Sequence, residues 1–130
     1  MRVLLDSNLF LAPSDLRMGL FRKIEDILGR VHFVTIRPVV DELSKLSRRK
    51  IQVRRTLRSA LEMVAKCEIL EVETGGETVD DVIVRVAYKE RLIVATLDSR
   101  LRRRLRRANV PVIYLRQNRL VCEPAIAEYG

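Results

Sequence analysis

The sequence has 130 residues, of which 48% are hydrophobic, and 25 Lys and Arg against 17 Asp and Glu give a net charge of +8. This length suits one domain with its own core, and the hydrophobic content argues against disorder. No apolar run approaches the roughly 20 residues of a membrane helix, and Asp6 comes too early for a secretory signal, so we expect a soluble cytoplasmic protein.

Short apolar runs alternate with segments of helical periodicity along the chain. In order, we expect a strand at residues 3–5, a helix at 16–28, a strand at 32–36, helices at 38–46 and 53–64, a strand at 67–72, a helix at 79–87, a strand at 92–95, a helix at 101–108, a strand at 112–115 and a short edge strand at 119–124. The strands are apolar at nearly every position, as in sheets covered on both faces. This order predicts a three-layer α/β/α sandwich with a mostly parallel sheet of about five strands, formed by residues 1–130 as one domain.

Carboxylates follow the first two strands. Asp6 ends the first strand, where a buried charge is costly unless something compensates it, although an Asx-type turn also explains an Asp there. Glu42 lies on the flank of the apolar face of the helix at 38–46, so it can lean toward the sheet while Asp41 faces water. Interaction with the helix dipole is the alternative role of Glu42.

Two later elements also carry acids near their beginnings. Thr78 and Asp81 have the spacing of a capping box, which gives Asp81 a structural or supporting role and leaves Asp80 for chemistry. Asp98 follows the strand at 92–95 and precedes a helix, where N-capping is the competing explanation.

These four acids, Asp6, Glu42, Asp80 and Asp98, each follow a different strand, at the edge where doubly wound sheets gather their ligand sites. Four carboxylates about 5 Å apart repel one another by on the order of 20 kcal/mol at an effective dielectric of about 20, so the cluster predicts protons or bound cations. All-oxygen ligands favour Mg²⁺ or Mn²⁺, which activate water and stabilise the charge on a phosphate.

Arginine makes up most of the basic residues, and its guanidinium grips phosphate with two parallel hydrogen bonds. The candidates for RNA binding form two groups, Arg100, Arg103 and Arg104 after Asp98, and Arg48, Arg49, Lys50 and Arg54 in and before the helix at 53–64. A solvated charged surface is the alternative for each of them.

Cys67 and Cys122 lack CxxC spacing and His32 is the only histidine, which argues against a zinc site.

The segments VLLDSN at 3–8, VVDEL at 39–43, VDDVIVRVA at 79–87 and VATLDSRLRRRLR at 94–106 together resemble the PIN-domain nucleases over nearly the whole chain. The resemblance implies an α/β/α sandwich that cleaves RNA with Mg²⁺ or Mn²⁺, with Asp6, Glu42, Asp80 and Asp98 as its catalytic, metal-binding acids. Asn8 and Thr96 match polar residues that line the site in the family. Ser7 keeps a hydroxyl where Thr is commoner, and Leu97 stands where Asn is frequent.

The segment LDSRLRRRLRRANVPVIYLRQNRLV, from residue 97 onward, resembles PIN proteins of small-subunit ribosomal RNA processing and their archaeal VapC-like relatives. This likeness implies RNA as substrate, an antitoxin or a ribosome-assembly protein as partner, and a homodimer. A non-catalytic RNA-binding scaffold in a ribonucleoprotein is the alternative function. A phosphoryl-transfer receiver or phosphatase fits poorly, because a second Asp near Asp6 and a Lys after Asp98 are missing.

Overall fold

The computed structural model of the chain describes residues 1–46 and 51–125, with their side chains except those of residues 51–54. In this part of the chain six strands form one sheet: β1 (Arg2–Leu5), β2 (His32–Ile36), β3 (Glu68–Leu70), β4 (Ile93–Ala95), β5 (Val112–Arg116) and β6 (Arg119–Glu123). Their spatial order is β3-β2-β1-β4-β5-β6, and all neighbours are parallel except β5 and β6. The mostly parallel sheet and its extra edge strand are confirmed.

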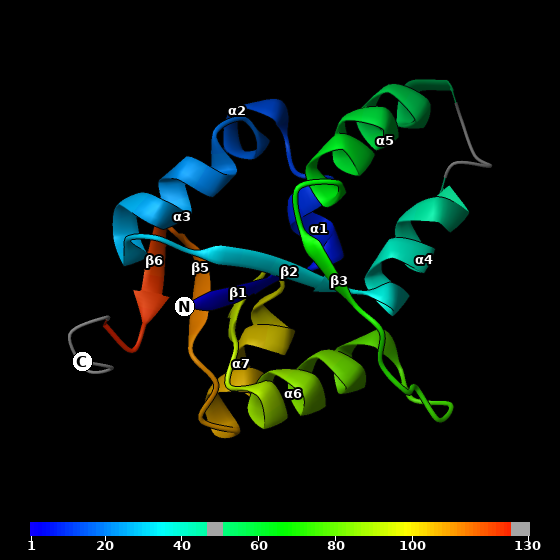
Figure 1. The fold of residues 1–130 in the computed structure, drawn as a ribbon. Coiled ribbons are helices and arrows are strands. Elements are labelled where there is room, and N and C mark those ends of the chain that lie inside the picture. Colours follow the sequence, from blue (N-terminus) through cyan, green and yellow to red (C-terminus); the bar gives the residue numbers. More distant parts are fainter. Residues whose placement is uncertain (47–50, 126–130) are drawn as a thin grey trace.

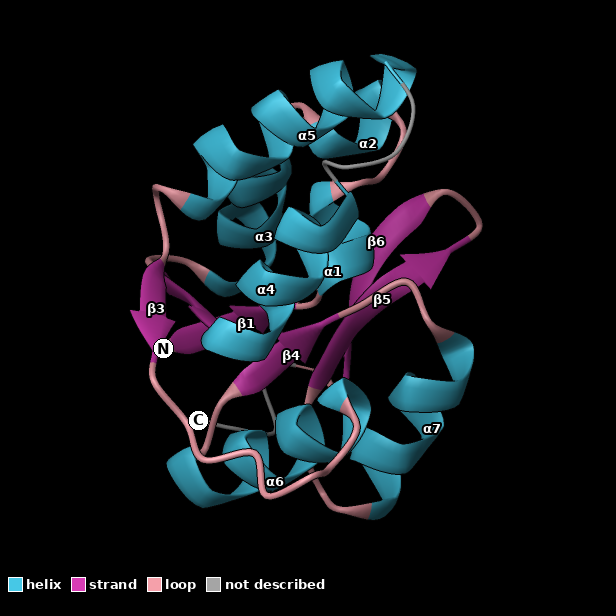
Figure 2. Ribbon diagram, turned by 90° about the vertical axis from the view of Figure 1, so that its right-hand side faces the viewer, coloured by secondary structure: helices cyan, strands magenta, loops and turns pink. Residues whose placement is uncertain are grey.

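Helices cover both faces of the sheet (Figure 1). One face carries α1 (Ser7–Phe10), α2 (Ser14–Arg17), α3 (Leu20–Leu28), α4 (Arg37–Leu46) and α5 (Ile51–Val64), and the other carries α6 (Val79–Glu90) and α7 (Ser99–Arg107). The view along the layers shows the sheet between these two groups (Figure 2). The expected three-layer sandwich is therefore confirmed.

The direction of winding reverses between β1 and β4, which are hydrogen-bonded neighbours with Leu5 opposite Ala95. The chain runs from β1 outward to β2 and β3, and then crosses back to β4 and β5 on the other side. Because parallel crossovers are right-handed, the two directions put their helices on opposite faces. The loops leaving β1 and β4 therefore diverge, and ligand sites of open α/β sheets lie at such a point.

The central strands are apolar because both of their faces are covered. Val3, Leu4 and Leu5 of β1 and Val94 of β4 are all 0% exposed, and Phe10 of α1 packs into the same core. At the antiparallel edge, Gln117 and Asn118 have φ of 50° and 62°, and positive φ at both central residues is typical of a type I′ hairpin turn.

One helix prediction was wrong in detail, and one short helix was missed. The helix expected at 16–28 is two helices, α2 and α3, because the chain turns at Gly19, which has a φ of 70°. Glycine adopts this left-handed conformation without the steric cost that other residues incur. The short helix α1 was not expected at all. No helix in the described ranges has the length and apolar character needed to cross a membrane.

Candidate active site

Asp6 lies at the carboxyl end of β1 and is only 5% exposed. Its Oδ1 accepts a hydrogen bond from the Ser7 N–H at 2.8 Å, and its Oδ2 accepts one from the Thr96 hydroxyl at 2.7 Å. Asp6 is also the N-cap of α1, so the local turn role considered for it is present. The turn alone does not explain the bond from Thr96, which lies 90 residues away in the chain.

Thr96 connects the loops that follow the two central strands. Its side chain is fully buried, and its Oγ1 accepts hydrogen bonds from the Asp98 N–H at 3.1 Å and from Nδ2 of Asn8 at 3.4 Å while it donates to Asp6. Oδ1 of Asn8 in turn accepts from the Leu97 N–H at 3.1 Å. One hydroxyl thus fixes the first acid relative to the loop that carries Asp98.

Asp98 is the N-cap of α7, as considered from the sequence. Its Oδ1 accepts from the N–H groups of Arg100 at 2.8 Å and Leu101 at 3.2 Å, which satisfies two of the free donors at the helix start. Among the hydrogen bonds of the described residues, none uses Oδ2 of Asp98. Capping therefore leaves one carboxylate oxygen for another ligand.

The four predicted acids act on one another electrostatically. Burial raises the pKa of Asp6, the charges of Asp80 and Glu42 raise it further, and the hydrogen bonds from Thr96 and Ser7 oppose that rise. Burial also raises the pKa of Asp80, again with the help of a neighbouring carboxylate, that of Asp98. Acids from four separate elements therefore share one region of negative potential.

The acids are nevertheless spaced openly. Glu42 is exposed on α4, which covers one face of the sheet, whereas Asp80 begins α6 on the other face. Within residues 1–46 and 51–125, no three Asp, Glu, His or Cys side chains are grouped closely enough to hold a metal ion among them. A cation here would therefore take few protein ligands and complete its shell with water or substrate oxygens.

Asp81 has the structural role that the sequence predicted. Its Oδ2 accepts from the Thr78 N–H at 3.3 Å, and its own N–H donates to the Thr78 hydroxyl at 3.2 Å, forming a capping box at the start of α6. Oδ1 of Asp81 also pairs with the Arg104 guanidinium at 2.7 Å. That guanidinium opposes the rise in the pKa of Asp80, so Arg104 already compensates part of the acidic charge.

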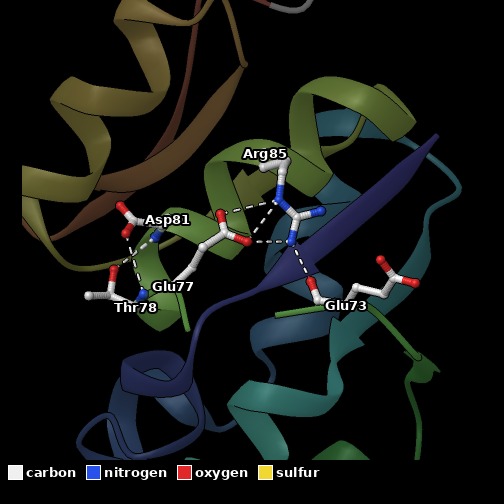
Figure 3. A network of polar contacts seen from close by, with 5 residues as sticks. All are labelled: Glu73, Glu77, Thr78, Asp81 and Arg85. Carbon is white, nitrogen blue, oxygen red and sulfur yellow. Dashed lines mark hydrogen bonds and ion pairs between the residues drawn. The ribbon is translucent and has the colours of Figure 1, made fainter. Parts of the chain in front are cut away.

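The segment between β3 and α6, which delivers Asp80, is tied to α6 by Arg85 (Figure 3). The Arg85 guanidinium pairs with the Glu77 carboxylate at 2.8 Å and donates to the carbonyl oxygen of Glu73. The capping box of Thr78 and Asp81 lies at the end of the same segment. Side chains rather than regular secondary structure thus hold this connection.

The predicted RNA-binding residues are placed unequally. Arg100 and Arg103 of α7 are exposed, while Arg104 is engaged with Asp81. The other group lies largely beyond what the structure describes: Arg48, Arg49 and Lys50 are outside the described residues, and so is the side chain of Arg54.

Sequence reasoning missed a contact between Arg102 and Tyr114. The Arg102 guanidinium carbon lies 4.3 Å from the centroid of the Tyr114 ring. Beside this pair is a pocket of about 100 Å³, here called the Tyr114 pocket, whose walls are residues 96–99, Arg102, Tyr114 and Leu115. The signal in the sequence was a tyrosine in the strand after the arginine-rich helix, but nothing local revealed which arginine it meets.

A larger groove, of about 760 Å³, lies at the opposite end of the strands. Met1, Arg2, Tyr88, Lys89 and Arg91 contribute to its lining. No Asp or Glu side chain lines it, so it lacks the acids on which the predicted chemistry depends.

Comparisons with known proteins agree with this geometry. A family model described as "PIN like domain" matches residues 3–118. A solved structure of the PIN domain endonuclease Utp24 is 28% identical, with a TM-score of 0.73, and the match covers 94% of this chain and 90% of that one. No curated protein sequence matches at a significant level.

Two further structures share the fold at low identity. A domain of a functionally unknown protein from Methanocaldococcus jannaschii is 14% identical with a TM-score of 0.65, covering 88% of this chain and 91% of that one. VapBC2 from Rickettsia felis, solved with a DNA fragment from its promoter, is 13% identical with a TM-score of 0.64, covering 89% of this chain and 100% of that one.

Proposed function

This chain belongs to the PIN-like domain family, and from that premise we propose that it is a divalent-metal-dependent endoribonuclease acting at the acidic site. The observation that carries the proposal is the buried carboxyl of Asp6 at the switch point, with its pKa raised by burial and by the charges of Asp80 and Glu42. A buried carboxyl among like charges favours either a proton or a cation. Carboxyl groups whose pKa is shifted by burial and by a neighbouring charge are also common at catalytic sites.

The donor set suits Mg²⁺ or Mn²⁺. Every predicted ligand is a carboxylate oxygen, which hard divalent ions prefer. The open spacing of the acids supports Mg²⁺ in particular, because this ion keeps several waters and is usually bound through one or two carboxylates together with substrate phosphates. When bound, such an ion supplies an activated water and stabilises negative charge on the phosphate.

The side chains of this protein then divide the work. One or two of the carboxylates of Asp6, Asp80 and Asp98 would hold the ion directly, and the remaining acids would act on it through its bound waters, with Glu42 as a ligand or as the group that orients the attacking water. Thr96, Ser7 and Asn8 keep the Asp6 carboxylate and the Asp98 loop in place through the hydrogen bonds described above. Asp81 caps α6 and fixes Arg104 beside the acids.

We favour ribosomal RNA processing over a toxin role. The Utp24 endonuclease is similar at 28% identity over most of both chains, whereas the VapBC2 likeness, at 13%, supports the fold alone. The exposed Arg100 and Arg103 support binding to the phosphate backbone. A ribosome-assembly protein is accordingly the favoured protein partner.

Cleavage of RNA with Mn²⁺ tests the proposal. The purified protein is incubated with ribosomal RNA precursor, transfer RNA and messenger RNA, with Mn²⁺ or EDTA, and new ends are mapped. We expect discrete ends in the precursor, abolished by EDTA, by Asp6→Asn and by Glu42→Gln. Asp41→Asn, which removes an exposed acid next to Glu42, is the matched control and should cleave normally.

Other outcomes assign other functions. Tight RNA binding without cleavage under any metal condition would contradict the nuclease proposal and favour the non-catalytic scaffold. Cleavage confined to transfer or messenger RNA would favour the toxin role and an antitoxin partner.

A further inference from the structure

The Tyr114 pocket adjoins the acidic site and shares two residues with it. Thr96 and Asp98 line the pocket, and the Thr96 hydroxyl also donates to Asp6. A ligand that reaches the acids with one group can therefore enter the pocket with its next group. In an RNA strand, the group next to a phosphate is a nucleoside, and its base is the part free to turn into a pocket.

The walls of the pocket combine a stacked pair with apolar side chains. Arg102 stands over the Tyr114 ring, and the half-buried Leu97 and Leu115 add apolar surface. Arg102 has no ion pair among the described residues, unlike Arg104, so the guanidinium is held by the ring rather than by a carboxylate. Proteins bind unpaired bases by stacking them on aromatic rings and on arginine planes.

The volume of the pocket limits the size of the group that it can enclose. Its volume of about 100 Å³ is well below the roughly 300–1,000 Å³ of pockets that enclose whole small molecules. One flat group fits this space better than a complete nucleotide does. The sugar and phosphate would then remain outside the pocket, whose wall includes Asp98.

We propose that the Tyr114 pocket receives one unpaired base of an RNA strand next to the acidic site, with Arg102 and Tyr114 as its stacking surface. The inference rests on the proposed function, because it assumes that the acids beside the pocket cleave an RNA phosphodiester bond. It adds that the base next to that bond is unpaired and contacts the protein at one fixed position. Such a contact determines which bond of a strand lies at the acids.

Binding to RNA that lacks single bases tests the pocket. A short single-stranded RNA, and versions with an abasic nucleotide at each position in turn, are titrated with the protein in EDTA, and affinity is measured by fluorescence anisotropy. We expect one position at which removal of the base lowers affinity by roughly 5- to 100-fold. In Tyr114→Leu and in Arg102→Lys, the intact and abasic strands should bind equally at that position.

Arg102→Lys separates stacking from charge. Lysine keeps the positive charge but lacks the planar group, so the dependence of affinity on salt should stay unchanged while the base effect disappears. Arg107→Lys makes the same change at an exposed position of the same helix, outside the pocket, and should keep the base effect. Circular dichroism of each variant checks that the protein is folded. If Tyr114→Leu does not fold, the result with Arg102→Lys alone shows whether the base effect depends on the pocket.

Two results would overturn the inference. One is equal affinity for every abasic strand, as expected if the pocket instead accepts a protein side chain. The other is a base effect that survives in Arg102→Lys. Because affinity is measured in EDTA, the comparison does not depend on cleavage. A wild-type protein that shows the base effect but cuts no RNA would contradict the proposed function while leaving the pocket assignment intact.

Discussion

Asp6 is held by hydrogen bonds and destabilised by its neighbours at the same time. Since burial and the charges of Asp80 and Glu42 raise its pKa, the folded protein binds this proton more tightly than the unfolded chain does. The stabilisation from the protonated form is therefore complete below the usual value of 3.8 and is lost as the pH rises through the higher pKa of the folded state. At neutral pH the ionised carboxylate lowers the stability of the fold.

Asp6→Asn should accordingly keep or raise the melting temperature at pH 7 in EDTA, although it abolishes cleavage. Each kcal/mol of relieved repulsion corresponds to roughly 2 to 6 °C in a domain of this size. The difference from wild type should shrink as the pH falls toward 4, because Asp6 is then increasingly protonated. Calorimetry at both pH values measures this, and a lower melting temperature at pH 7 than wild type would contradict it.

Asp98 allows capping and metal binding to be separated. Asparagine is as good an N-cap as aspartate, so Asp98→Asn should leave the stability of the metal-free protein within about 0.5 kcal/mol of wild type, while Asp98→Ala should cost about 1 kcal/mol. Mn²⁺ should raise the melting temperature of the wild type, since it binds the folded state. That rise should be lost in both variants, and a full rise in Asp98→Asn would exclude Asp98 as a ligand.

The four acids of the proposed site could be singled out from the sequence because each follows a strand that was predicted from an apolar run. Parallel strands bring their carboxyl ends to one edge, so position along the chain translated into position in space. The contact of Arg102 with Tyr114 was not accessible. α7 carries several arginines, and only the folded structure shows which of them lies over the Tyr114 ring.

At the scale of the elements, the connection from β3 to α6 matters to the site because it carries Asp80 past the sheet edge to the other face. Arg85 holds it through Glu77 and the carbonyl of Glu73. Both partners of the ion pair are more than a third exposed, so the pair contributes little to global stability, about 0–1 kcal/mol. We expect the ion pair instead to reduce local opening of the connection between β3 and α6.

Arg85→Ala should therefore speed amide hydrogen exchange in residues 73–78 while lowering the free energy of unfolding by no more than about 1 kcal/mol. Arg22→Ala, which removes an exposed arginine of α3 without an ion pair among the described residues, is the control and should leave exchange there unchanged. Unchanged exchange in Arg85→Ala would show that the backbone holds the connection without this side chain.

Most helices and strands could be predicted from hydrophobic periodicity. The exceptions are a helix pattern that continues across a bend and a helix too short to show a period. Leu16, Leu20 and Ile24 keep a four-residue spacing across the bend at Gly19, so the pattern could not reveal that the helix is divided there. The helix α1 is a single turn, too short to produce a period. Its N-cap, Asp6, was recognised, but as a turn rather than as the start of a helix.

In the whole molecule, the two cysteines lie at opposite edges of the sheet. Cys67 directly precedes β3 and Cys122 belongs to β6. Five strand spacings of about 4.8 Å separate those strands, far more than the roughly 4.4–6.8 Å between Cα atoms that a disulfide allows. The two cysteines are accordingly not joined by a disulfide.

The protein is exposed to a mild oxidant and then denatured, and thiol titration of the monomer should find two reactive thiols. Fewer than two would contradict the distance between Cys67 and Cys122 that the fold sets. In the native protein Cys67 should react slowly, because burial raises the pKa of its thiol to about 12. The reactive thiolate is then scarce at neutral pH. Peptide mapping after timed alkylation identifies the slow residue.

The hydrogen bond from Thr96 to Asp6 joins residues that are 90 positions apart. During translation the chain emerges amino end first, so Asp6 leaves the ribosome long before Thr96 and Asp98 exist. A ribosome-bound intermediate that ends before Thr96 lacks this hydrogen bond and can hold Asp6 only through its local bond from the Ser7 N–H. The proposed cleavage of RNA therefore requires that translation has passed Thr96.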